Sequence, residues 1–234
     1  MLRCNSRTKE LHRRWSIRYT WPMVRAMVVL GRKYQIDELY SAGYDKLLHK
    51  YVEREARFLY PGRSLTIEGE DLIEAATIVK ALGFHDMHRA ALYDCCQLDG
   101  SEIICGMTNP SLSKACRRLD QEDIARCIDA RSRLVEAQFK ICAAMFQSTL
   151  NAGSPTEGSA CKSVKCRPLL SQFRLVPVQE RFQSKTKHDP LRVHTRNTWF
   201  DSSCDKLCPS CKEWFEKQDV SMRQEVLDKL GDYV

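Results

Sequence analysis

The spacing of apolar residues through residues 23–51 most constrains what this chain can fold into. Pro22 suits the first turn of a helix, and apolar residues follow it at intervals of three and four. Gly31 interrupts this pattern, and a second stripe, for which Asp37 is the expected cap, extends to Tyr51. The spacing predicts two helices, joined at residues 31–35, that bury their apolar faces. The first of these faces consists of Val24, Met27, Val28 and Leu30.

The rest of the chain repeats helical spacing. The spacing of its apolar residues predicts helices over residues 70–82, 85–96 and 120–150, and a last helix after Cys211. The longest of these begins near Asp120, which is expected to cap it. Glycines and an Asn-Pro pair predict a turn over residues 99–111. No apolar alternation is long enough for a substantial sheet, so we expect a mainly all-α fold.

The composition is that of a globular chain. It has 234 residues, 43% of them hydrophobic, which is enough for a packed core. No apolar run reaches the roughly 18 residues of a membrane span, and the first residues lack the layout of a secretory signal. We expect an intracellular protein of the cytoplasm or nucleus, without a membrane partner. Its 12 cysteines should then be reduced. Most of them are expected singly on apolar helix faces as small hydrophobes, among them Cys95, Cys116, Cys127 and Cys142.

The net charge of +7 is unevenly distributed. Residues 1–25 hold seven basic side chains and one acidic one, and residues 161–198 hold nine and two. Basic segments of this kind either stay solvated or bind an acidic partner such as nucleic acid. A zinc-stabilised, nucleic-acid-associated regulator that uses residues 162–196 is therefore an alternative function.

Two pairs of cysteines form the strongest candidate site. Cys161 and Cys166 are separated by four residues, and Cys208 and Cys211 by two. Four thiolates in two close pairs can bind one structural zinc ion and stabilise a small module with little core of its own. The alternative is a set of reduced cysteines packed in a core. Further residues could replace a member of the set: Cys204, His188 and His194.

The chain carries no catalytic constellation. It has no glycine-rich phosphate loop, nucleophile elbow or metalloprotease pair. The Cys208-Pro-Ser-Cys211 motif is similar to a redox dithiol, but only one predicted helix follows it, whereas a redox domain needs further strands. His85 and His88 are expected to be surface or packing residues. The sequence thus predicts a non-enzymatic protein.

Several segments resemble a known family. Leu30-Gly-Arg-Lys-Tyr-Gln-Ile-Asp-Glu-Leu-Tyr resembles the closing helices of a BTB/POZ domain, particularly in fungal, mushroom-type BTB domain-containing proteins. Other segments are similar to that family's helical extension and its Cys-rich ending: Asp71-Leu-Ile-Glu, Ala91-Leu-Tyr-Asp-Cys-Cys, Leu119-Asp-x-x-Asp, Cys127-Ile-x-Ala-Arg-x-x-Leu, Trp199-Phe-Asp and Leu207-Cys-x-x-Cys. The resemblance covers residues 22–234 and lacks the N-terminal sheet of a BTB/POZ domain, which implies an N-terminally truncated protein.

The resemblance implies a protein-interaction module that acts as an adaptor or scaffold. Its expected partners are another BTB protein or a cullin-type ubiquitin ligase, with dimerisation impaired by the missing half. The expected organisation is a disordered basic N-terminus (1–21), closing BTB/POZ helices (22–52), a helical extension (53–150), a linker (151–160) and a Cys-rich module ending in a helix (161–234). Loss of the missing half is expected to expose an apolar interaction surface: Val24, Val28, Tyr34, Leu39 and Tyr44.

Overall fold

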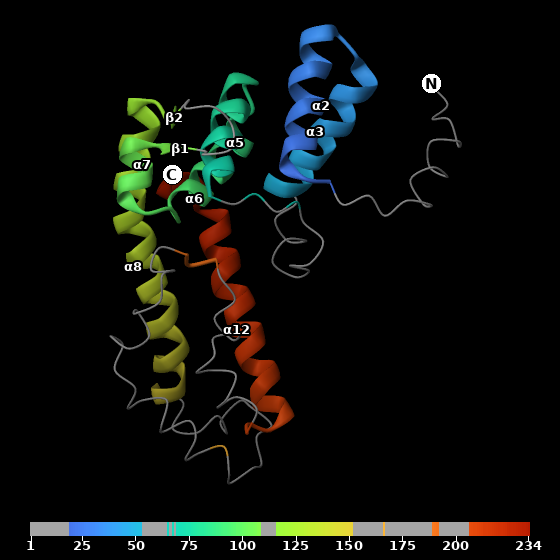
Figure 1. The fold of residues 1–234 in the computed structure, drawn as a ribbon. Coiled ribbons are helices and arrows are strands. Elements are labelled where there is room, and N and C mark those ends of the chain that lie inside the picture. Colours follow the sequence, from blue (N-terminus) through green and yellow to red (C-terminus); the bar gives the residue numbers. More distant parts are fainter. Residues whose placement is uncertain are drawn as a thin grey trace, which may run out of the picture. The chain divides into compact units, whose positions relative to one another are not determined.

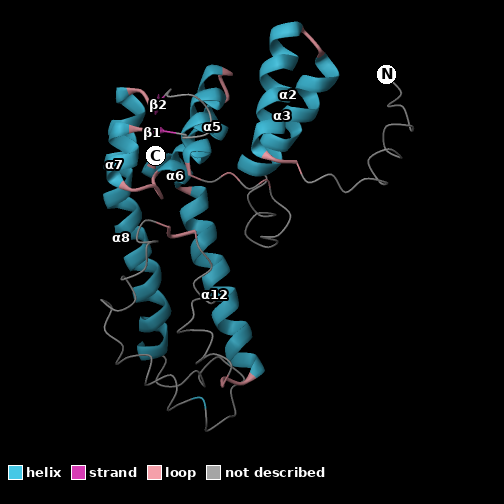
Figure 2. Cartoon of the chain, in the orientation of Figure 1, coloured by secondary structure: helices cyan, strands magenta, loops and turns pink. Residues whose placement is uncertain are grey.

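A computed structural model describes eight parts of the chain: residues 19–52, 65, 67, 69–108, 116–151, 166, 189–191 and 206–234, single residues included. Most of these residues are helical, which confirms the prediction of a mainly all-α fold (Figure 2). The chain divides into two compact units, Met1–Asp71 and Leu72–Val234.

The first unit contains a helical hairpin. Helix α2 (Trp21–Tyr34) and helix α3 (Asp37–Tyr51) lie side by side, in blue in Figure 1. The chain reverses at Gln35, whose φ of 55° places it in the left-handed region. The Ile36 N–H then donates to the Gly31 carbonyl at 2.8 Å and closes the end of α2. Ile36, rather than the predicted Asp37, is the N-cap of α3.

Gly31 lies inside α2, so the prediction that it interrupts the helix is wrong. The helix continues for three more residues to Tyr34. A Cβ atom on Gly31 would lie 2.6 Å from the Tyr40 backbone nitrogen of α3, closer than real side chains approach. The glycine is needed because two backbones meet there, and a single sequence does not distinguish this role from that of a helix breaker.

The second unit consists of helices and a small two-stranded ladder. Its elements are α5 (Glu70–Ala81, which begins at the unit boundary), α6 (His85–Cys95), α7 (Gly100–Cys105), β1 (Met107–Thr108), β2 (Cys116–Arg117), α8 (Gln121–Asn151), α12 (Pro209–Asp228) and α13 (Leu230–Tyr233). The strands are antiparallel and pair Met107 with Arg117. None of the described helices combines the length and hydropathy needed to cross a membrane.

One local prediction in this unit is incomplete and another is wrong. The turn expected over residues 99–111 contains helix α7, in which the Asp99 N–H donates to the Glu102 side chain at 2.8 Å and stabilises the first turn. A helix of six residues is too short for apolar spacing to reveal it. Cys116 lies in β2 rather than on a helix, because its segment pairs with β1.

Helix α8 is the longest described helix of this unit. Its 31 residues correspond to about 46 Å, which confirms the predicted extent. The predicted cap is confirmed as well, since the Asp123 N–H donates to Asp120 Oδ1 at 2.9 Å. Helix α12 lies beside it, as the yellow and red ribbons of Figure 1 show. The core of the unit is formed by buried residues of α5, α6 and α8, among them Ile73, Val79, Ala91, Leu92, Cys95, Cys127, Ala130 and Leu134. Burial of Cys95 and Cys127 confirms their predicted role as small hydrophobes.

Candidate metal centre

The first turn of α12 positions two of the predicted metal ligands. Cys208 is the N-cap in an extended conformation, and Pro209 occupies the first helical position, where its missing N–H costs no hydrogen bond. Cys211 is the third residue of the helix. The Cys-Pro-x-Cys spacing therefore places both thiols at the same helix end.

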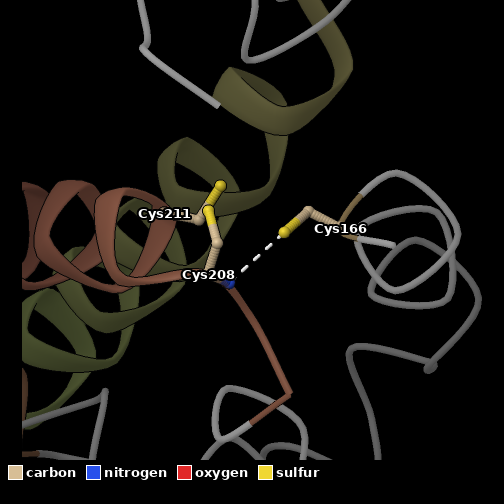
Figure 3. Close-up of side chains that lie close together, drawn as sticks. All are labelled: Cys166, Cys208 and Cys211. Carbon is tan, nitrogen blue, oxygen red and sulfur yellow. Dashed lines mark hydrogen bonds between the residues drawn. The ribbon is translucent and has the colours of Figure 1, made fainter. Parts of the chain in front are cut away.

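A third thiol joins them from a segment distant in sequence. The sulfur atoms of Cys166, Cys208 and Cys211 all lie within 4.8 Å of one another. Figure 3 shows Cys166 facing the two cysteines of α12, and the Cys208 N–H donates to Cys166 Sγ at 3.3 Å. The Cys166 and Cys211 side chains are 1% and 3% exposed, whereas Cys208 is half-buried. This group, hereafter the cysteine cluster, has one solvent-accessible member and two enclosed ones.

The chemistry of the cysteine cluster suits a metal ion. The positive end of the α12 dipole favours negative charge at these sulfurs, and a thiolate is the form that binds metal. A Zn–S bond of about 2.3 Å in a tetrahedral site puts sulfurs about 3.8 Å apart, so separations within 4.8 Å need little contraction. The three cysteines can therefore hold a metal ion.

Three of the four predicted zinc ligands come together in this way. The fourth, Cys161, lies outside the described residues, as do Cys204, His188 and His194. Of the basic stretch 162–196, only Cys166 and residues 189–191 are described, so nucleic-acid binding by that stretch stays a prediction.

The predicted interaction surface is only partly exposed. Val24 and Val28 are buried, so the expectation that they are exposed is wrong. The physical reason is the close approach of α3, since a Cβ on Gly43 would lie 2.7 Å from Val28 Cγ2. Leu39 and Tyr44 are half-buried, whereas Tyr34 is 61% exposed.

A buried charged network at the start of α8 was not predicted from the sequence. The His88 and Asp123 side chains, both buried, meet with 3.1 Å between Nε2 and Oδ2. The Lys80 ammonium donates to Asp123 Oδ2 at 3.0 Å and to Asp120 Oδ2 at 2.6 Å. Burial lowers the pKa of His88 below its usual value, against the attraction of the Asp123 carboxylate. This network joins α5, α6 and α8, and a carboxylate in the first turn of a long helix was its only signal in the sequence.

Comparison with protein-family models, with curated proteins and with solved structures finds no match. The resemblance to BTB/POZ proteins is therefore a prediction that these comparisons leave untested.

Proposed function

We propose that this chain is a non-enzymatic protein-interaction module in which one structural zinc ion anchors the C-terminal helix. The convergence of Cys166, Cys208 and Cys211 carries this proposal. A metal ion there would link residue 166 to the first turn of α12, and α12 packs on α8. Zinc is the metal that thiolate sets of this kind most commonly hold in intracellular proteins, and Cys161 is the predicted fourth ligand.

Native mass spectrometry of the purified, reduced chain tests the zinc site. We expect one zinc ion per chain, lost in the variants Cys166→Ser and Cys211→Ser. Cys105→Ser is the matched control, because Cys105 is exposed on α7 and outside the cysteine cluster. Absence of zinc in the wild-type chain, or zinc retained in both cluster variants, would overturn the zinc site.

Exposed apolar side chains of α2 support the interaction role. Met23, Leu30 and Tyr34, hereafter the α2 stripe, are exposed and follow one another at intervals of seven and four residues, which places them on one side of the helix. Apolar side chains gathered on one exposed helix side are typical of protein-binding surfaces. The partners expected from the resemblance are a second copy of this or another BTB protein and a cullin.

Sedimentation equilibrium of the zinc-loaded chain tests self-association, and calorimetry with a purified cullin N-terminal domain tests the second partner. Leu30→Lys should weaken whichever interaction is found by at least tenfold in Kd. Ile128→Lys is the matched control, since Ile128 is 47% exposed on α8 and Leu30 is 43% exposed. The interaction role fails if the chain stays monomeric and binds no cullin, or if both variants weaken binding equally.

A further inference from the structure

We propose that the cysteine cluster is a redox switch, in which a hydroperoxide oxidises Cys208 and Cys211 to a disulfide and thereby releases the zinc ion. This inference rests on the zinc site proposed above and adds its regulation. It is carried by two observations. The three sulfurs are mutually within 4.8 Å, and only one of the three side chains is accessible to a small oxidant.

Accessibility identifies the attacking sulfur. Cys166 and Cys211 are enclosed, whereas Cys208 is half-buried at the N-cap of α12. A zinc-bound cysteine is a thiolate, the form that attacks a peroxide. A hydroperoxide that reaches the cluster therefore meets the Cys208 sulfur first.

The reaction balances with a hydroperoxide as the two-electron oxidant. The Cys208 thiolate attacks one peroxide oxygen, and the O–O bond breaks. The products are a sulfenic acid and an alkoxide, or hydroxide when the oxidant is hydrogen peroxide, which takes a proton from solvent to become an alcohol or water. The Cys211 thiolate then attacks the Cys208 sulfur, an S–S bond forms, and hydroxide leaves and is protonated to water. The disulfide would remove the Cys208 and Cys211 thiolates as ligands, so that a bound zinc ion would be released to solvent.

Cys211 is the resolving partner because it belongs to the same helical turn as Cys208. Figure 3 shows both side chains on the first turn of α12, while Cys166 approaches from a separate segment. A Cys208–Cys211 disulfide encloses only two residues, so it constrains nothing beyond that turn. Zinc, in contrast, links residue 166 to α12. Oxidation thus replaces the zinc link between residue 166 and α12 by a disulfide within the first turn of α12.

Zinc release under peroxide tests this proposal. The reduced, zinc-loaded chain is mixed with hydrogen peroxide and a zinc-sensitive dye, and the product is mapped by non-reducing peptide mass spectrometry. We expect one equivalent of zinc to be released together with a Cys208–Cys211 disulfide, and dithiothreitol with added zinc to restore the starting species. Cys105→Ser should behave like the wild-type chain.

Several outcomes would overturn the switch while leaving the zinc site standing. These are zinc retention under peroxide, a disulfide that contains Cys166, or oxidation of Cys208 beyond the sulfenic acid without a disulfide. The wild-type map decides between them, so the result does not depend on variants that bind zinc weakly. Failure of the zinc site itself is seen earlier, as absence of zinc from the reduced chain.

Discussion

His88 Nε2 lies 3.1 Å from Asp123 Oδ2, and this buried pair ties α6 to the first turn of α8. Carboxylate oxygens only accept, so the imidazole donates through Nε2. Lys80 and Arg126 lie beside the pair, and their positive charges compensate the Asp123 carboxylate inside the core. The pair makes stability depend on pH.

The first prediction concerns pH. Burial lowers the pKa of His88 in the folded state, so the folded protein favours the neutral imidazole. In the unfolded chain His88 binds a proton near pH 6.5, the ordinary value for histidine. The stability that comes from burying the neutral imidazole is therefore fully present above about pH 6.5. It is lost as the pH falls from there through the lower pKa of the folded state, because only the unfolded chain gains a proton in that range. Urea unfolding from pH 7.5 to 5 should show a loss of stability that is absent in His88→Gln. His85→Gln, at an exposed site, should retain it.

The second prediction concerns Asp123. Asp123→Ala removes the acceptor of both His88 and Lys80 and leaves the buried His88 N–H without its partner. Loss of a buried hydrogen-bond partner costs about 1–3 kcal/mol of unfolding free energy. Chemical denaturation should show this cost, whereas Asp86→Ala, at an exposed site on α6, should change stability by less than about 0.5 kcal/mol. Equal effects would argue against a structural role for the network.

The third prediction concerns Gly31. Gly31→Ala forces a Cβ atom against the Tyr40 backbone, and such overpacking typically costs about 1–3 kcal/mol. Gly100→Ala is the control, because its Cβ would meet only the Arg131 guanidinium at 3.5 Å, an ordinary contact. In that helix alanine should be neutral or stabilising by up to about 1 kcal/mol. The thermal unfolding temperature should therefore fall for Gly31→Ala and stay the same or rise for Gly100→Ala. An unchanged or higher unfolding temperature for Gly31→Ala would contradict the close approach of α2 and α3.

The fourth prediction concerns Tyr93, whose hydroxyl anchors a distant segment. It donates to Asp189 Oδ1 at 2.6 Å and accepts from the Leu191 N–H at 3.2 Å. Burial raises the pKa of Tyr93 well above its usual value, so the hydroxyl keeps its proton. Tyr93→Phe should lower stability by about 1–3 kcal/mol and speed hydrogen exchange at Leu191. Tyr34→Phe, at a largely exposed site, should leave both unchanged.

The fifth prediction concerns metal removal. If zinc anchors the start of α12, a strong chelator should increase hydrogen exchange in the first turn of α12, near Cys211. Hydrogen exchange at the C-terminal end of α12 and in α13 should increase less. There the Arg133 guanidinium donates to the Asp232 carbonyl at 2.7 Å and holds α13 on α8 independently of the cysteine cluster. Uniform deprotection of both ends, or none, would contradict this arrangement.

Helical spacing by itself determined most of the secondary structure. Apolar residues at intervals of three and four define the inward face of α2, α3 and α8, because burial of such a face stabilises a helix wherever its partner comes from. Helix α7 was not predicted, because its six residues span less than two turns and cannot show a repeating apolar spacing. Gly31 was misinterpreted because the residue that requires a glycine there, Tyr40, lies in another helix.

For the candidate site, the sequence determined which residues have metal-binding chemistry, and the tertiary structure decided which of them meet. The spacing of Cys208 and Cys211 already placed two thiols on one helical turn, since that distance is local. Forty-one residues separate Cys166 from Cys208, and only the packing of the chain brings their sulfur atoms within 4.8 Å. The pairing of His88 with Asp123 likewise depends on how α6 packs against α8. Local spacing is encoded in a few residues, whereas these long-range contacts depend on the packing of the whole core.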